Sequence, residues 1–290
     1  MRRARIPRLR GGQRGQVLAV VTEVLNGSDR DLRDHDHAAL YHALKGAQHV
    51  HCAFVFDTEI LDLLADRQDR RVEFIWLSVE ELAQSLKEMG GGLQVLVDRA
   101  REVIPTLADK LGAQAVYANQ DYEPIAKERD AQVSRSLDQR GCVLHTYKDH
   151  VIFEKDEVLT QAGRPFTVFA PYKRAWLAKL NPFYCNAYPV GVYRDALART
   201  GSFRVPSLEQ IGFRATNLKQ MKLPTGMIGA RRMFQDFRKR ILPPGARGKR
   251  GFPSSMRQCD NSMTRATYDN AVAKLRCGSA WSISRDTRIP

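Results

Sequence analysis

The sequence lacks the features that mark several large classes of protein. No stretch approaches the roughly 20 consecutive apolar residues that a membrane-spanning helix needs. The Arg-rich start is not followed by the apolar core and cleavage site of a signal peptide. The five cysteines are scattered and form no C-x-x-C pair, which excludes a zinc ribbon and favours a reducing compartment. We therefore expect a cytoplasmic protein that neither spans a membrane nor depends on disulfide bonds.

Short catalytic and phosphate-binding motifs are also missing. No G-x-G-x-x-G or G-x-x-x-x-G-K-[ST] loop follows a predicted strand, so the usual modes of nucleotide-phosphate binding have no support. There is no G-x-S-x-G turn and no set of Ser, His and Asp in a recognisable order. The catalytic residues therefore stay unknown from motifs alone.

The positive charge is concentrated at the two ends of the chain. The formal net charge is +14, from 46 Lys and Arg against 32 Asp and Glu. Residues 1–28 hold six Arg and one Glu, and residues 241–290 hold nine Lys or Arg and three Asp, so the sequence between them is nearly neutral. Basic ends can neutralise nucleic-acid phosphates. They can equally be extensions without a partner, and the sequence leaves both interpretations open.

Between about residues 48 and 160, short apolar runs alternate with longer stretches of helical periodicity. Strands are expected at residues 49–57, 93–97, 115–119 and 142–147, and helices at 74–89, 100–111 and 125–137. Gly112 is expected to end the second of these helices. Strands that alternate with helices of 10–15 residues predict an α/β protein with a Rossmann-like, doubly wound parallel sheet.

After residue 160 the pattern changes. Residues 171–180 predict a helix with Pro171 in its first turn. Four prolines between residues 181 and 225 indicate a linker with short ordered pieces. A further helix is expected from Gly229 to Ile241, as the start of a truncated helical domain, and the periodicity is weak after it.

The first candidate site is the run from Arg30 to His37, in which Asp and His alternate. These residue types can chelate a divalent metal, but adjacent residues on a helix or strand point in different directions. An Asp that caps a helix beginning near Ala38 explains the run more simply. We therefore expect no metal site.

The second candidate site is the run from Asn119 to Pro124, at the carboxyl end of the third predicted strand. Ligands bind at that edge of an open α/β sheet, so Asp121 and Glu123 are expected to face a crevice. Capping of the following helix by these acids is the alternative. The residues alone leave both open.

Five ordered blocks of the sequence resemble the amino-terminal half of DNA photolyases and cryptochromes. They lie in the family's order and at its spacings, over about residues 29–240. The blocks are Asp31-Leu32-Arg33 with His35-Asp36; Phe56-Asp57; Arg70 to Ile75; Ala118 to Pro124 with Glu128-Arg129-Asp130; and Phe166 to Lys173 with Ala175-Trp176-Leu177. Bacterial class I deoxyribodipyrimidine photo-lyases are the nearest resemblance.

The resemblance implies a monomeric, light-driven DNA-repair lyase. Such enzymes use reduced FAD and an antenna pigment to split cyclobutane pyrimidine dimers in UV-damaged DNA. A cryptochrome-type blue-light signalling protein is one alternative. A generic nucleotide-binding α/β module, related to electron-transfer flavoproteins, is another, although the block from Phe166 to Leu177 argues against it.

The resemblance also implies a pigment site. Its residues, matched to deazaflavin-binding members, are Arg30, Phe54, Asp57, Asp121, Glu123 and Lys127. Folate-binding members carry an Asn-Glu pair where this chain has Ile125-Ala126, so a deazaflavin is expected in preference to a reduced folate. An apolar wall with a few convergent polar groups suits a planar pigment with polar edges.

The resemblance weakens at both ends. Before Asp31 the residues do not fit the family's first strand, although residues 17–21 offer an alternative strand. Near Ile241 the match stops ahead of the FAD-contacting segment, which implies a truncated chain that lacks most of the FAD site and is inactive by itself. The expected organisation is an unmatched basic segment (1–28), a photolyase-like α/β antenna domain (29–160), an interdomain linker (161–225), the start of an FAD-binding helical domain (226–241) and an unmatched basic tail (242–290).

Overall fold

The structure is a computed structural model that describes residues 15–20, 32–199 and 204–241. It divides into two compact units. The first contains the described residues up to Tyr147 and those from Pro189 onward, and the second contains Lys148–Tyr188. Within the described residues, no helix has both the length and the apolar content needed to cross a bilayer.

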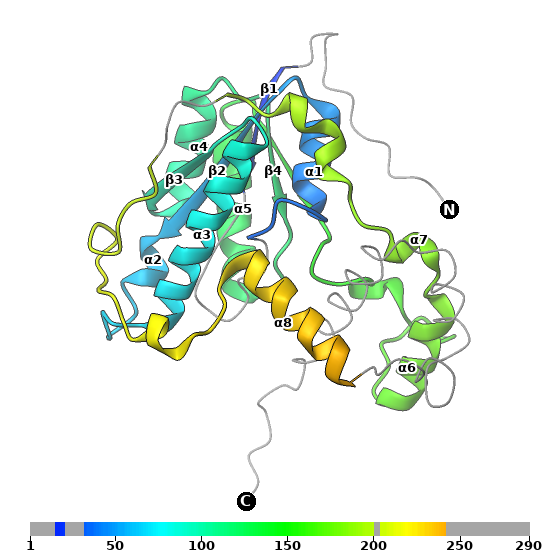
Figure 1. Cartoon of the computed structure of the whole chain (residues 1–290). Coiled ribbons are helices and arrows are strands. Elements are labelled where there is room, and N and C mark those ends of the chain that lie inside the picture. The colour runs from blue at the N-terminus through cyan, green and yellow to red at the C-terminus, as the bar shows by residue number, and fades with distance from the viewer. Residues whose placement is uncertain (1–14, 21–31, 200–203, 242–290) are drawn as a thin grey trace, which may run out of the picture. The chain divides into compact units, whose positions relative to one another are not determined.

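The first unit is built on a five-stranded parallel sheet with the order β3-β2-β1-β4-β5 (Figure 1). The strands are β1 (Gln16–Val20), β2 (His49–Asp57), β3 (Leu93–Asp98), β4 (Ala115–Asn119) and β5 (Val143–Tyr147). Each strand pairs in parallel with its neighbours in that order. The predicted α/β fold with a doubly wound parallel sheet is therefore confirmed.

Strand β1 occupies the centre of the sheet. Val17 pairs with Val50 of β2 on one side and with Ala115 of β4 on the other. Residues 17–20 are at most 2% exposed, because a central parallel strand is covered on both faces and needs a continuous apolar run. The alternative strand expected near residues 17–21 is thus confirmed, and it lies inside the segment expected to be unmatched.

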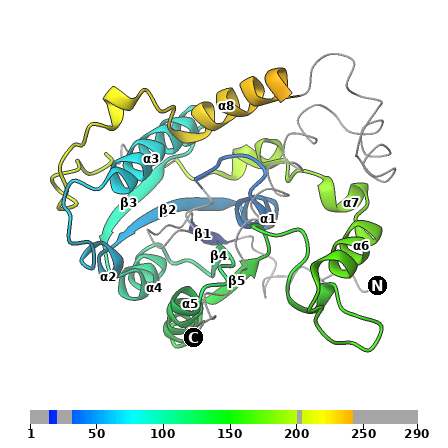
Figure 2. The same cartoon turned by 90° about the horizontal axis from the view of Figure 1, so that it is seen from below.

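Helices cover both faces of the sheet (Figures 1 and 2). They are α1 (Ala38–Gly46), α2 (Thr58–Leu61), α3 (Arg70–Glu88), α4 (Ala100–Lys110) and α5 (Pro124–Asp138). Side chains alternate along β1, so Val17 and Ala19 pack with α1 and α3, whereas Leu18 and Val20 pack with α4 and α5. Two apolar layers therefore hold one sheet, as the sequence pattern predicts.

Two helix ends test the capping predictions. Gly112 takes a φ of +59°, and Ala113 N donates to Ala108 O at 2.8 Å, so the expected glycine stop after α4 is confirmed. The Asp cap expected for α1 is wrong, because His37 is the N-cap and its Nδ1 accepts from Leu40 N at 3.1 Å. Asp36 lies one residue too early and takes a left-handed φ of 48°.

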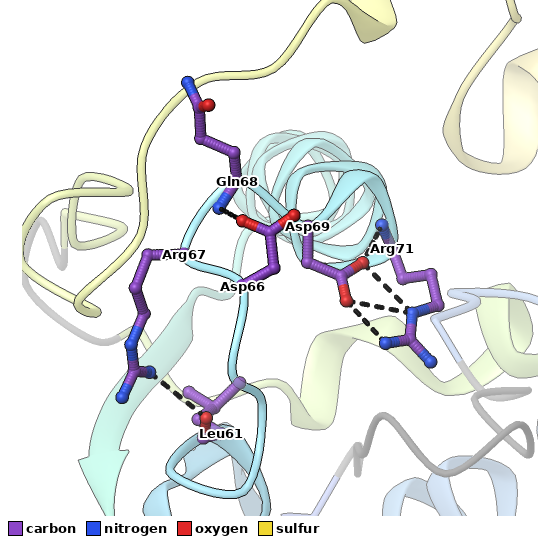
Figure 3. Close-up of polar contacts among 6 residues, drawn as sticks. All are labelled: Leu61, Asp66, Arg67, Gln68, Asp69 and Arg71. Carbon is purple, nitrogen blue, oxygen red and sulfur yellow. Dashed lines mark hydrogen bonds and ion pairs between the residues drawn. The ribbon is translucent and has the colours of Figure 1, made fainter.

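The loop before α3 carries a compact set of polar contacts (Figure 3). Asp69 is the N-cap of α3 and accepts from Arg71 N at 2.8 Å. The Arg71 side chain also bonds to this carboxylate, and this lowers the pKa of Asp69. Arg67 donates to Leu61 O at 3.2 Å and so ties the loop back to the end of α2. These contacts fix where the long helix begins.

The chain returns to the first unit after residue 188. Its elements there are η2 (Val190–Ala196), η3 (Leu218–Met221) and α8 (Gly226–Ile241). Ala198 N donates to Val50 O at 2.9 Å, and Pro206 and Thr216 bond to side chains of α3. Residues 204–241 therefore pack with the sheet domain, although the sequence assigned them to a linker and a second domain. The expected boundaries at residues 160 and 225 stay predictions.

The second unit has a small apolar cluster of its own. Its elements are η1 (Lys155–Glu157), α6 (Phe169–Lys179) and α7 (Pro182–Cys185). The cluster consists of Ile152, Phe153, Leu180 and Cys185, with Val158, Trp176 and Tyr184 packed against it. The helix expected at residues 171–180 is confirmed with a start two residues earlier, so Pro171 lies in its first turn.

Candidate functional site

The carboxyl ends of the five strands meet at one edge of the sheet. From β1 the chain winds outward to β2 and β3, and from β4 it winds the other way to β5. The order therefore reverses between β1 and β4, and at such a switch point the connecting loops diverge and leave room for a ligand. At this point β4 ends with Asn119, and residues 120–123 lead into α5.

Asn119 and His37 form a buried polar pair at the switch point. Asn119 is 8% exposed and His37 is 1% exposed. The Asn119 Oδ1 atom accepts from Ala39 N at 2.9 Å, while its Nδ2 lies 3.3 Å from the His37 Nδ1. One side chain thus ties the end of β4 to the first turn of α1. The sequence analysis missed this pair, because the two residues are 82 positions apart.

Asp121 shapes the turn that leads into α5. Its Oδ1 accepts from the backbone of Tyr122 at 2.5 Å and from that of Glu123 at 3.0 Å, which is an Asx-type turn. Glu123 is the N-cap residue of α5 and makes no side-chain cap bond. Lys127, one turn into the helix, is exposed. The structure therefore brings Asp121, Glu123 and Lys127 together at the start of α5.

Asp57 and Phe54 are both buried, but they have different surroundings. Asp57 ends β2, is 3% exposed and accepts from Glu59 N at 3.1 Å as the N-cap of α2. Phe54 is 1% exposed in the core beneath α1 and α3, with its ring edge-on to Phe56 at 4.9 Å. Asp57 thus lies at the candidate edge, whereas Phe54 is a core side chain. Arg30, the sixth predicted residue, lies outside the described residues.

A half-buried ion pair stands beside Asp121. Arg129 and Asp130, in the second turn of α5, approach to 2.9 Å with side chains 11% and 24% exposed. Burial raises the pKa of Asp130, and the charge of Asp121 acts in the same direction, against the lowering effect of Arg129. Both residues lie in a part of the sequence that resembles photolyases, but the sequence alone assigns them no role. The charge of Asp121 is thus felt by Asp130 in the neighbouring helix.

Arg101 links three elements at the same edge. It pairs with Glu59 of α2 at 2.5 Å and donates to Gln132 of α5 at 3.3 Å, and it belongs to α4 itself. The helices that follow β2, β3 and β4 are therefore held together by one guanidinium. This arrangement positions α5, whose first turns carry Glu123 and Lys127.

The side chains at the start of α5 offer hydrogen-bond acceptors, Asp121 and Glu123, with the exposed Lys127 one turn further on. Among the described residues, no group of three or more His, Cys, Asp or Glu side chains is arranged to hold a metal ion. The carboxylates of Asp121 and Glu123 instead suit an organic ligand whose edge carries N–H or O–H donors. The fold and this edge define a Rossmann-like, doubly wound α/β protein, a class in which ligands bind at the carboxyl ends of the strands.

The family follows from the sequence comparison. Residues 28–190 match the family model for DNA photolyase, and the chain belongs to this family. The resemblance of its ordered blocks to photolyases and cryptochromes is thereby confirmed.

Curated relatives agree with this assignment. The chain is 31% identical over 189 residues to the deoxyribodipyrimidine photo-lyase of Synechococcus sp. (strain ATCC 27144 / PCC 6301 / SAUG 1402/1), covering 63% of this chain and 39% of the relative. It is 31% identical over 195 residues to that of Halobacterium salinarum, covering 63% and 40%. To cryptochrome-2 of Gallus gallus it is 28% identical, covering 63% and 33%. The chain thus spans about 40% of the length of these two photo-lyases.

Solved structures share the fold. The cryptochrome of Synechocystis sp. PCC6803 superposes with a TM-score of 0.61 at 18% identity, over 80% of this chain and 48% of that one. A class III photolyase from Agrobacterium tumefaciens gives a TM-score of 0.53 at 19% identity, over 77% and 41%. At these identities the similarity supports the architecture and not the chemistry of individual residues.

Proposed function

We propose that the chain serves as the pigment-binding antenna part of a light-driven DNA-repair enzyme that splits cyclobutane pyrimidine dimers. The observation that carries the proposal is the match of residues 28–190 to the photolyase family, with deoxyribodipyrimidine photo-lyases among the relatives. In the complete enzyme, bound reduced FAD supplies the electron that opens the dimer. The contribution of this chain is to hold and orient an antenna pigment.

The proposed pigment site is the edge between the ends of β1 and β4, with a deazaflavin as its ligand. One carboxylate oxygen of Asp121 accepts hydrogen bonds from the Tyr122 and Glu123 amides, so the orientation of the side chain is fixed before a ligand arrives. Glu123 makes no cap bond and can accept from an N–H at the pigment's edge. Lys127 lies at the rim, and Arg30 completes the set by family resemblance.

Asp57 and Phe54 contribute from the other side of β1. Two strand spacings separate β2 from β4, which is roughly 10 Å, a span that one fused-ring ligand can bridge. Because Asp57 is occupied by the first turn of α2 and Phe54 is in the core, we assign these two residues to supporting the site from beneath.

Titration of the full chain with a deazaflavin and, in parallel, with a reduced folate tests the proposal by absorbance and fluorescence. We expect deazaflavin binding that weakens about tenfold or more in Asp121→Ala and in Glu123→Ala, since each loses a charged hydrogen bond. Glu128→Ala is the matched control, an exposed acid on the same helix. Tighter binding of the folate, or equal binding by all three variants, would show that the site is assigned wrongly.

The repair activity itself is a property we propose for the complete enzyme. Its partner would be UV-damaged DNA, and its state a monomer in the cytoplasm, where the buried thiols Cys52, Cys142 and Cys185 stay reduced. Restoration of the two adjacent thymines within a dimer-containing oligonucleotide under blue light is the direct assay.

A blue-light signalling role is the second candidate. The observation in its favour is the 28% identity to cryptochrome-2 of Gallus gallus over 196 residues. Both roles use the same antenna edge, so pigment binding does not separate them. Light-dependent repair by the complete protein supports the first role, and a photochemical cycle without repair supports the second.

A further inference from the structure

A stretch of the second unit combines many aromatic rings with basic residues and has no acidic residue. From Val158 to Tyr188 there is no Asp or Glu, although the average composition of the chain predicts three or four in that length. The same stretch holds four basic residues, Arg164, Lys173, Arg174 and Lys179, and seven aromatic residues, Phe166, Phe169, Tyr172, Trp176, Phe183, Tyr184 and Tyr188. This stretch of the second unit therefore has a formal net charge of +4.

The structure arranges several of these rings in a row. Phe169, Lys173 and Trp176 recur at helical spacing and so share one face of α6. Trp176 packs edge-on against Phe153 at 5.5 Å, Phe153 contacts Tyr184 at 4.8 Å, and Tyr184 contacts Phe183 at 5.3 Å. We call this line of side chains, from Phe169 on α6 to Phe183 on α7, the aromatic row.

The two ends of the aromatic row are its most exposed members. The side chains at its middle pack on the small cluster of the second unit. Phe169 is 69% exposed and Phe183 is 76% exposed. Single exposed apolar residues are ordinary. Here, however, Phe183 is linked through Tyr184 to the ring of Phe153 in the small cluster, and Phe169 lies on the same face of α6 as Trp176.

Positive charge lies beside the exposed end at Phe169. Lys173 and Arg174 are both exposed on α6. Lys179 is engaged elsewhere, since its ammonium lies 5.1 Å from the Phe153 ring and donates to Glu157 O. The N-cap residue of α6, Val168, has no side-chain acceptor, so the positive end of the helix dipole adds to this charge. The acidic residues of the second unit all precede Val158 in the sequence. One of them, Glu157, pairs with Lys148 at 2.6 Å.

We propose that the aromatic row binds single-stranded nucleic acid, with bases stacked on Phe169 and Phe183 and phosphates held by Lys173 and Arg174. Stacking on exposed rings beside basic side chains is the chemistry by which proteins hold unpaired strands without reading their sequence. The inference goes beyond the proposed function and uses none of the pigment-site residues. In a repair enzyme, such a surface would hold unpaired nucleotides near an extruded dimer.

Fluorescence anisotropy of the full chain with a labelled oligothymidylate of about 16 nucleotides tests this proposal. We expect Phe169→Ala and Phe183→Ala each to weaken binding about tenfold. Phe169→Trp keeps a stacking ring and should retain binding, with its indole fluorescence quenched by the oligonucleotide. Leu63→Ala, which changes a residue of the first unit that is 76% exposed, is the matched control and should leave binding unchanged.

The phosphate contacts proposed for Lys173 and Arg174 are tested by the salt dependence of binding. The basic chain ends contribute the same salt-dependent background to every variant, so the comparison is made across a salt series. Replacing Lys173 and Arg174 together by Gln should lower the slope of log K against log salt by about 1.4, since each phosphate contact on a single strand contributes roughly 0.7.

Two outcomes would overturn the proposal. One is equal affinity of the wild type and both Phe→Ala variants at every salt concentration. The other is full retention of oligonucleotide binding by Phe169→Leu and Phe183→Leu, which would show that binding does not depend on bases stacking on these rings. Neither outcome bears on deazaflavin binding at Asp121 and Glu123, so failure here and failure of the proposed function are distinguishable.

Discussion

At the scale of single residues, the candidate edge depends on polar side chains that are fixed by the backbone around them. Asn119 holds the start of α1, Asp121 folds the turn before α5, and Asp57 caps α2. Each of these side chains satisfies amides that a helix end or a turn leaves without partners. These side chains therefore have a structural role, and the positions of the loops at this edge are set before any ligand arrives.

Asp34 adds a pH-sensitive contact just before α1. It accepts from the Ser85 hydroxyl of α3, and its Oδ1 lies 3.0 Å from the His35 Nδ1. The hydrogen bond with His35 lowers the pKa of Asp34 most, Ser85 lowers it further, and burial opposes both. A carboxyl whose pKa is lowered in the folded state stabilises the fold at pH values above its pKa in the unfolded chain, which is about 3.9. This stabilisation is lost as the pH falls through the lower, folded-state pKa.

We accordingly predict that the free energy of unfolding of Asp34→Asn falls less than that of the wild type as the pH is lowered from about 5 to 3. Urea unfolding at a series of pH values measures the difference. Asp62→Asn, an exposed acid on the loop after α2, provides the control. Parallel curves for wild type and Asp34→Asn would contradict the prediction.

At the scale of elements, α3 is the helix that organises the returning chain. Trp76 donates from its Nε1 to Pro206 O at 2.7 Å, and Arg70 donates from its Nε to the Asn217 side chain at 2.8 Å. Glu73 is 2% exposed and accepts from both the amide and the hydroxyl of Thr216. One face of α3 thus packs on the sheet while polar side chains along it hold the segment from Pro206 to Asn217.

We predict that Glu73→Gln lowers the free energy of unfolding by about 1–3 kcal/mol, because hydrogen bonds to a buried charged acceptor are among the stronger ones. Urea unfolding measures the loss, and limited proteolysis should cut the segment at residues 206–217 faster. Glu88→Gln, an exposed position on the same helix whose side chain bonds to Gln84, should change neither. A loss of stability without faster cleavage would mean that Glu73 supports the helix and not the segment.

At the scale of the whole molecule, the sheet depends on a strand that lies outside the photolyase match. The family model begins at residue 28, whereas β1 comprises Gln16–Val20 and pairs with both β2 and β4. Because β1 separates the strands that carry Asp57 and Asn119, it sets the spacing of the candidate site. The short segment before the matched region is therefore part of the fold.

Leu18→Ala tests this placement of β1. Leu18 is 0% exposed and packs in the layer beneath α4 and α5, so the cavity left by truncation should cost about 2–5 kcal/mol in the free energy of unfolding. Urea unfolding measures the loss. Gln16→Ala, at the exposed first position of the same strand, is the control and should cost little. An equally small effect at both positions would mean that β1 does not pack in the sheet as described.

The sequence by itself determined the alternation of strands and helices, the family, and the edge at which Asp121 and Glu123 lie. These follow from periodicities within a few residues and from the rule that parallel strands end at one edge. The residues that bind a pigment, and the domain boundaries, stay predictions.

Only the tertiary structure decided which distant groups meet. In the structure Asn119 pairs with His37, and β1 lies at the centre of the sheet. The Phe54 side chain is part of the core, and the returning chain contacts α3 through Thr216. Contacts between residues 80 to 150 positions apart depend on strand order and packing, and no local pattern encodes them. The residue at the cap of α1 shows the same limit on a small scale, because the left-handed turn at Asp36 moved the cap by one residue.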